Sequence, residues 1–179
     1  HGSRKFIADR NTKVSINQGV EVNLLRALGY QRNLSIRRYL DHCFVASNFR
    51  RILNGSVPPP DIILAATPDY HIAAEGARFA KRMKIPYVVD LRDQWPDSFL
   101  ENFTSPLLRT GMRMLLANDF RKLRTMLQGA VGLVGMMESM LDWGIGHAER
   151  KRRTSDRVFY LGTEAIPEPD PVFLNKLRE

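Results

Sequence analysis

The chain has 179 residues and a formal net charge of +8. Its apolar fraction of 44% is that of an ordinary globular protein, which excludes a disordered or collagen-like chain. A chain of this length buries roughly 70% of its extended-chain surface, so its core needs no disulfide or metal. The single cysteine, Cys43, excludes an internal disulfide and favours a reducing compartment. The opening His-Gly-Ser is typical of a purification-tag remnant.

Positive charge gathers toward both ends of the sequence. Residues 1–60 carry a net +7, residues 61–104 a net −2 and residues 105–179 a net +3. This balance favours a polyanion, an anionic membrane surface or a phosphorylated ligand as partner, without choosing among them. The least charged apolar stretch, residues 125–137, has 13 residues, below the ~20 needed to cross a bilayer. Neither a membrane span nor a secretory signal is therefore predicted.

The predicted elements begin with a strand at residues 20–27. A helix follows at residues 36–53, with Ser35 as its N-cap. Three prolines then lead into a continuously apolar run at residues 61–67, which is typical of a strand buried on both faces of a parallel sheet. The next helix is expected at about residues 70–84.

The second half of the chain continues this alternation. Strands are predicted at residues 86–90, 130–135 and 157–161, helices at about residues 106–127 and 136–143, and a basic loop at residues 144–155. Strands that alternate with helices predict βαβ units, hence an α/β fold with a parallel sheet and right-handed crossovers. Ligand sites in such sheets lie at the carboxyl ends of the strands, here residues 67–70, 90–97, 135–138 and 162–164.

The middle of the chain carries a distinctive motif. Residues 86–98 read PYVVDLRDQWPDS, so an Arg-Asp-x-Trp-Pro pattern directly follows a predicted strand. Together with the strand and helix before it, this segment resembles the N-terminal domain of family-four glycosyltransferases, in the branch that assembles bacterial surface polysaccharides. Residues 29–38 are similar to that branch more loosely, and residues 130–141 and 158–162 stand where such a domain has its last strands. The resemblance spans roughly residues 10–165.

The resemblance implies a Rossmann-like parallel sheet with helices on both faces, one half of the two-domain GT-B architecture. It implies an enzyme that moves a sugar from a nucleotide-sugar donor to a glycan or lipid-linked acceptor, without a metal or cofactor. The implied organisation is a tag remnant at residues 1–3, an acceptor-side domain at 4–165, and at 166–179 a linker with the start of a donor-binding domain. The expected location is the cytoplasm, or peripherally the inner face of the membrane.

Three features depart from the family pattern. The family's opening strand and Gly-Gly loop have no counterpart before Phe6, and its donor-binding C-terminal domain has none after Gly162. Many relatives carry His-Asp where this chain has Arg92-Asp93, so that histidine's role is not carried over. These departures predict one domain of a larger enzyme, inactive by itself.

Arg92 and Asp93 form the candidate catalytic pair. By the resemblance, Asp93 would lie near the acceptor hydroxyl as a hydrogen-bond acceptor or weak base, and Arg92 would hold a phosphate or carboxylate. A structural Arg-Asp-Trp turn is an equally good explanation. Asp69 is a candidate for the acceptor cleft, although a helix N-cap explains it better. His71 would titrate near neutrality and face the cleft, or equally be a solvated residue of the first helical turn. The other cleft candidates are Trp95, Gly135, Glu138, Thr163 and Glu164.

Two groups of basic residues are candidates for contact with a membrane or a phosphate, and a solvated surface explains both as well. The first group shares one face of the helix predicted at residues 106–127 and comprises Arg109, Arg113, Arg121 and Arg124. Each would contribute ~1 kcal/mol near an anionic surface. The predicted core stripe on another face comprises Leu108, Met112, Leu116, Phe120, Leu123 and Leu127. The second group comprises Arg150, Lys151, Arg152 and Arg153.

Two alternative functions stay open. One is a non-catalytic basic α/β module that binds nucleic acid or another anionic ligand, although no interleaved aromatic-basic motif or helix-turn-helix spacing supports nucleic acid. The other is half of a nucleotide-sugar epimerase, which shares the two-domain architecture. The four histidines and Cys43 lack metal-ligand spacing, and neither a nucleophile elbow nor a phosphate-binding P-loop occurs.

Overall fold

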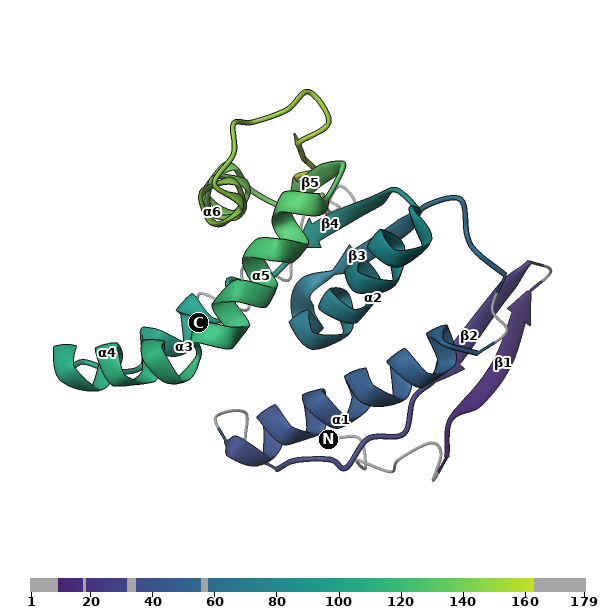
Figure 1. The fold of residues 1–179 in the computed structure, drawn as a ribbon, viewed down its shortest axis with the longest axis horizontal. Coiled ribbons are helices and arrows are strands. Elements are labelled where there is room, and N and C mark those ends of the chain that lie inside the picture. The colour runs from purple at the N-terminus through teal and green to yellow at the C-terminus, as the bar shows by residue number, and fades with distance from the viewer. Residues whose placement is uncertain (1–9, 18, 32–34, 56–57, 163–179) are drawn as a thin grey trace, which may run out of the picture.

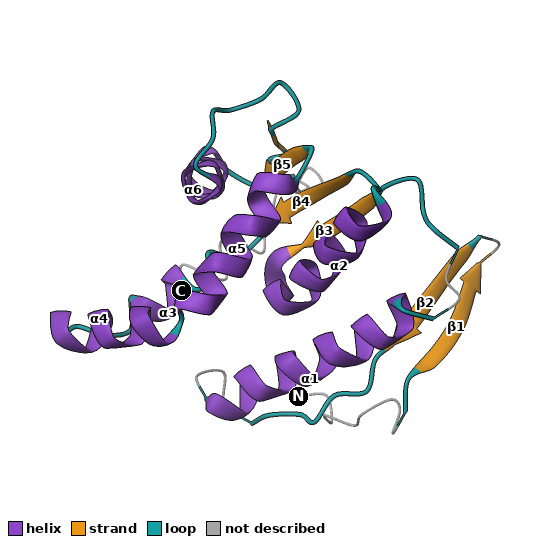
Figure 2. Cartoon of the chain, viewed as in Figure 1, coloured by secondary structure: helices purple, strands orange, loops and turns teal. Residues whose placement is uncertain are grey.

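The structure is a computed structural model that describes residues 10–17, 19–31, 35–55 and 58–162. Within these ranges the strands form two sheets (Figures 1 and 2). An antiparallel pair consists of β1 (Thr12–Asn17) and β2 (Val20–Leu24). The second sheet is parallel and has the order β3 (Ile63–Ala66), β4 (Tyr87–Leu91), β5 (Gly132–Gly135) and β6 (Arg157–Val158).

Helices connect and flank the parallel strands. They are α1 (Ile36–Leu53), α2 (Tyr70–Met83), α3 (Asp97–Leu100), α4 (Pro106–Leu115), α5 (Ala117–Gly129) and α6 (Glu138–Ala148), with a 3-10 turn at Thr67–Asp69. The predicted α/β fold with a Rossmann-like parallel sheet is therefore confirmed. In the part of the chain that the structure describes, no helix combines the length and the apolar character needed to cross a bilayer.

The helices α2, α5 and α6 contact the same face of the parallel sheet. Their glycines lie against Ile63, Tyr87 and Leu91, side chains that the strand register puts on one face. Each crossover leads to the next neighbour in the same direction, so right-handed connections bring all three helices to one side. Helix α1 packs on α2. The resemblance implies helices on both faces of the sheet. Within the described residues, helices cover one face only.

The opposite face of the sheet carries exposed apolar side chains. The prediction that the strand at residues 61–67 is buried on both faces is wrong, because Leu64 is 67% exposed while its neighbour Ala65 is buried. The register aligns Leu64 with Val88, and Asp90 with Val134, along this open face.

The core lies between the sheet and its helices. The side chains of Val89, Leu91 and Leu133 are fully buried there, each contributing about 1.5–3 kcal/mol to the stability of the fold. Helix α6 approaches so closely that a Cβ at Gly144 would collide with the Leu91 side chain. The helix continues through Gly144 and Gly146 to Ala148, whereas the sequence predicts an end near residue 143.

Local signals predict most elements well, and contacts between distant segments change others. The helix at residues 36–53 has the predicted bounds, and the Ser35 hydroxyl accepts from the Arg38 amide at 3.2 Å. The strand predicted at residues 20–27 is not part of the parallel sheet but pairs with β1. The single helix predicted at residues 106–127 breaks at Leu116, where the buried side chain lies between α4 and α5.

We expect Asp156→Ala to destabilise the fold by about 3 kcal/mol, because it leaves the largely buried Arg150 side chain without its carboxylate partner. Asp156 accepts two hydrogen bonds of 2.7 Å from Arg150 and others from the amides of Leu133 and Arg153. Burial alone raises the pKa of Asp156, but these bonds outweigh it and lower the pKa to about 2. Urea denaturation at pH 7 measures the loss.

The matched control is Glu138→Gln, which removes the exposed ion pair with Arg152. It should leave the unfolding midpoint almost unchanged, since exposed pairs contribute little. Equal destabilisation by both substitutions would contradict the role given to Asp156.

Candidate functional site

A cavity of about 630 Å³ lies beside the carboxyl ends of β3 and β4. The N-terminal parts of α1 and α2, the segment 93–102 and the end of α4 surround it. Its polar wall includes Asp93, Ser98 and Asn102, and its apolar wall includes Met112 and Leu116. This is the edge at which parallel α/β sheets bind ligands, as the order of strands predicts.

Thr67 fixes how the chain leaves β4. Its buried hydroxyl donates to the Asp90 carbonyl at 3.2 Å and accepts from the amides of Arg92 at 2.9 Å and Asp93 at 3.4 Å. The carboxylate of Asp93 then lines the cavity and accepts from the Ser98 hydroxyl at 3.2 Å. Within the described residues the other oxygen of Asp93 accepts no hydrogen bond, and the side chain is partly buried.

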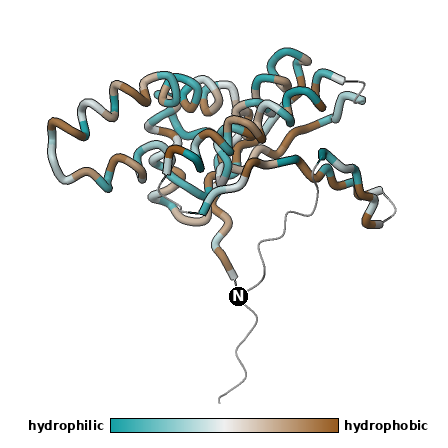
Figure 3. The backbone as a smooth tube through the Cα atoms, turned by 90° about the horizontal axis from the view of Figure 1, so that it is seen from below, coloured by the Kyte–Doolittle hydropathy of each residue, from teal (hydrophilic) through white to brown (hydrophobic). Residues whose placement is uncertain are grey.

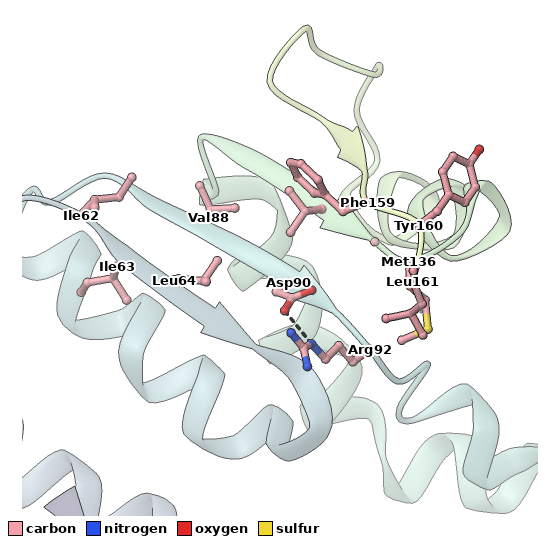
Figure 4. A pocket seen from close by; sticks show the side chains of 13 residues that line it. Ile62, Ile63, Leu64, Val88, Asp90, Arg92, Met136, Phe159, Tyr160 and Leu161 are labelled. Atoms are coloured by element: carbon pink, nitrogen blue, oxygen red, sulfur yellow. Dashed lines mark hydrogen bonds and ion pairs between the residues drawn. The ribbon is translucent and has the colours of Figure 1, made fainter. Parts of the chain in front are cut away.

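Arg92 lies on the other side of the strand. Its guanidinium pairs with Asp90 at 2.7 Å and lines a separate groove of about 580 Å³ on the open face of the sheet (Figure 4). Leu64, Val88 and Phe159 line the same groove. Adjacent residues of an extended chain point to opposite sides, so the structure separates the two members of the predicted catalytic pair.

Aromatic rings form one wall of the cavity. The Trp95 ring lies 6.5 Å from the rings of Tyr39 and Tyr70 and 5.3 Å from that of Phe99, measured between centroids. The indole N–H of Trp95 is buried and has no hydrogen-bond partner in the described part of the chain. A buried donor without a partner is uncommon, and it marks a point where a ligand oxygen or a water molecule would be stabilised.

A buried carboxylate stands behind this wall. Asp119 of α5 accepts from the Tyr39 hydroxyl at 3.0 Å and from the Tyr70 hydroxyl, and the Lys122 ammonium lies 3.8 Å away. Burial, together with the hydrogen bond and the charge of Asp119, raises the pKa of both tyrosines. Both hydroxyls therefore keep their protons at neutral pH and hold α1, α2 and α5 together.

His71 is buried beside the aromatic wall. Desolvation lowers the pKa of His71 to about 4, so the ring is neutral at pH 7, and the prediction that it titrates near neutrality is wrong. Its Nδ1 lies 3.8 Å from the sulfur of Cys43. As a neutral ring it acts as a hydrogen-bonding and packing group rather than as a charged one.

Asp69 is the N-cap of α2, as predicted. Its carboxylate accepts from the amides of His71 at 3.1 Å and Ile72 at 3.2 Å. It also lies 3.5 Å from His42, whose ring lines the cavity. Desolvation raises the pKa of Asp69.

Asp97 ties the segment after β4 to α6. Its carboxylate lies 2.6 Å from Nε2 of His147 and accepts from the Trp143 indole at 3.0 Å. Burial raises the pKa of Asp97, but these hydrogen bonds and the nearby charges lower it overall. The last residue of the Trp-Pro-Asp sequence therefore has a structural role, since it anchors the segment that carries Asp93 and Trp95.

Two other predicted cleft residues, Gly135 and Glu138, lie away from the cavity. Gly135 ends β5 and lines the groove with Arg92. Glu138 is exposed and pairs with Arg152 at 2.8 Å. Thr163 and Glu164 lie outside the described residues. Of the predicted set, the structure thus brings Asp93, His71 and Trp95 together at one cavity.

The predicted basic groups are divided in the structure. Arg109 and Arg113 belong to α4, and Arg121 and Arg124 to α5. Arg113 lies over the Phe120 ring at 4.7 Å, and Arg124 pairs with Glu149 at 2.5 Å.

In the second group, Arg150 holds Asp156, Arg152 pairs with Glu138, and Arg153 donates to the Ala130 carbonyl at 2.8 Å. Lys151 is exposed. Three of these four side chains therefore have structural partners, which weakens the case for a shared phosphate patch.

Sequence reasoning missed Tyr39, His42, Tyr70 and Asp119. Tyr39 and His42 are three residues apart on α1, so they share a helix face, and this spacing was an available signal. Asp119 gave none, because its partner Tyr39 is 80 residues away in the sequence.

We predict that His71 makes the fold less stable in acid. The unfolded chain protonates this ring near pH 6.5, but the folded protein does so only near pH 4. Its contribution is therefore complete above pH 6.5 and is lost as the pH falls toward 4, a difference of about 3 kcal/mol. Denaturation at pH 7 and pH 4.5 should show a smaller acid loss for His71→Gln than for the wild type. An NMR titration midpoint of the His71 ring near 6.5 would contradict the assignment.

Comparison of the chain with protein-family models, with curated proteins and with solved structures gives no match. No group of three or more metal-ligating side chains gathers in the described ranges. The α/β fold is established by the parallel sheet and its helices, and the cavity is the feature that bears on function.

Proposed function

We propose that this chain is the acceptor-binding part of a glycosyltransferase, which moves a sugar from a nucleotide sugar to a glycan or lipid-linked acceptor. The observation that carries the proposal is that Asp93 and Trp95, two members of the Arg-Asp-x-Trp-Pro motif, line one cavity at the carboxyl edge of a parallel sheet. The motif is the most specific part of the resemblance to family-four glycosyltransferases. The proposed location is the cytoplasm, or peripherally the inner face of the membrane.

The chemistry of the cavity suits a sugar acceptor. Flat aromatic rings such as Trp95 and Phe99 offer apolar surface to the C–H face of a sugar ring. Asp93, Ser98 and Asn102 offer acceptors and donors for its hydroxyl groups. A cavity of about 630 Å³ lies in the range that small-molecule ligands occupy.

Asp93 is the residue proposed to meet the reacting hydroxyl. A carboxylate that accepts from the acceptor O–H orients that oxygen for attack and can take up its proton as the new glycosidic bond forms. The bond between the donor sugar and the leaving nucleoside diphosphate breaks in the same transfer. The donor would be bound mainly by a second domain, whose basic side chains and helix N-termini stabilise the leaving diphosphate without a metal.

Arg92 does not share this role in the proposal. It lies on the open face of the sheet with Asp90, out of the cavity. The nucleic-acid alternative gains no specific support, since the basic residues are spread over several elements and many are paired.

We predict that Asp93→Asn lowers turnover at least ~10-fold in the complete native gene product, because an amide cannot take up the proton. The assay incubates the protein with a panel of radiolabelled nucleotide sugars and a lipid extract of the source cells, and counts label in the extractable product. The control Asp61→Asn removes the same charge from an exposed position before β3, at the opposite edge of the sheet, and should keep wild-type turnover.

Two results would count against the proposal. Unchanged turnover for Asp93→Asn removes this carboxylate from the mechanism. Absence of transfer from every nucleotide sugar by the wild-type protein overturns the transferase function itself.

A further inference from the structure

Helix α4 exposes most of its apolar side chains. Leu107 is 86% exposed, Leu108 62%, and Met114 and Leu115 73% each. No residue of this helix is buried, although it is rich in large apolar side chains. Scattered exposed apolar residues are ordinary, but a contiguous group on one short element marks an interaction surface.

The apolar residues of α4 occupy one side of the helix. The spacings of four and three residues put Leu107, Gly111 and Met114 on one side of the helix. Leu108 and Leu115 lie beside them and are two helical turns apart. Arg109 and Arg113 are four residues apart and lie on the opposite side. A cationic side opposite an apolar side is the pattern of helices that lie in a membrane interface.

The segment that contains this helix carries no acidic residue. Residues 102–118 contain two arginines and no aspartate or glutamate. In Figure 1, α4 extends from the body at the end of the molecule away from the β1–β2 pair, and Figure 3 shows apolar segments at that end. The helix is therefore free to meet a flat surface without obstruction from the sheet.

A second copy of the chain fits this surface less well than a membrane. Stable dimers bury 20–30 residues on each side, whereas α4 has ten residues and a length of about 15 Å. A two-fold contact through the apolar side of α4 would leave Arg109 on the opposite side, where the second copy supplies no negative charge to it. Anionic lipid headgroups supply an opposite charge for Arg109.

We propose that α4 is a membrane-docking helix that lies in the surface of an anionic bilayer. Leu107, Leu108, Met114 and Leu115 enter the boundary between headgroups and acyl chains, and Arg109 contacts the headgroup phosphates, while Arg113 stays over the Phe120 ring. The sequence predicts a membrane contact through a face with four arginines, whereas the proposed membrane contact is the apolar side of α4. This docking is independent of any transferase activity, because it needs no donor or acceptor.

The test is flotation of the protein with lipid vesicles in a sucrose gradient. The wild type should float with vesicles of phosphatidylcholine and phosphatidylglycerol in a 7:3 ratio and only weakly with phosphatidylcholine alone. The triple substitution Leu107→Gln, Leu108→Gln and Met114→Gln should lower the bound fraction at least tenfold. All three side chains are exposed, so circular dichroism should be unchanged.

Two controls match these changes. Ile16→Gln alters an equally exposed apolar residue of β1, and should float like the wild type. Arg109→Gln should weaken flotation more than Lys151→Gln, which removes the same charge from an exposed position outside α4. Failure of the wild type to float, or equal flotation of the triple variant, overturns the proposal. A dimer seen by analytical ultracentrifugation and lost in the triple variant, without flotation, assigns the surface to a second copy instead.

Discussion

The buried carboxylate of Asp119 holds together the helices that surround the cavity. It is 2% exposed, and it accepts hydrogen bonds from a tyrosine of α1 and a tyrosine of α2. A buried charge is costly unless its oxygens are satisfied, so these helices are held where both hydroxyls reach it. Because Tyr39 and Tyr70 also form the aromatic wall, the same interaction that stabilises the helix packing sets the shape of the cavity.

A second constraint acts at the ends of the strands. The Thr67 hydroxyl bonds three backbone groups of the chain that leaves β4, and Asp97 anchors the following segment to α6. The residues between these two anchors have little freedom. Asp93 and Trp95 consequently face the cavity, whereas Arg92 turns to the open side of the sheet and pairs with Asp90. Successive side chains of an extended chain point to opposite sides, and this alternation decides which residue of the motif reaches the cavity.

The elements that local chemistry specifies could be predicted from the sequence. The Ser35 and Asp69 caps gave the starts of α1 and α2, and the apolar runs gave β3, β4 and β5. What could not be predicted depends on contacts between distant segments. The break at Leu116, the close approach of α6 to Leu91, and the pairing of β1 with β2 belong to this class. The aromatic wall formed by Tyr39 and Tyr70 could not be predicted either, since nothing near Asp119 in the sequence indicates the tyrosines that it binds.

Helix α4 connects the two surfaces on which the proposals rest. Met112 and Leu115 line the cavity, while Leu115 and its neighbours also form the exposed apolar side of the helix. The cavity therefore has a polar side at Asp93 and an apolar side that continues onto the outer surface of α4. An amphiphilic acceptor, with a sugar at one end and a hydrocarbon chain at the other, matches both sides at once. If α4 rests on the bilayer, such an acceptor reaches Asp93 without exposing its hydrocarbon chain to water. Because that exposure is unfavourable, the arrangement favours a lipid-linked acceptor over a free glycan.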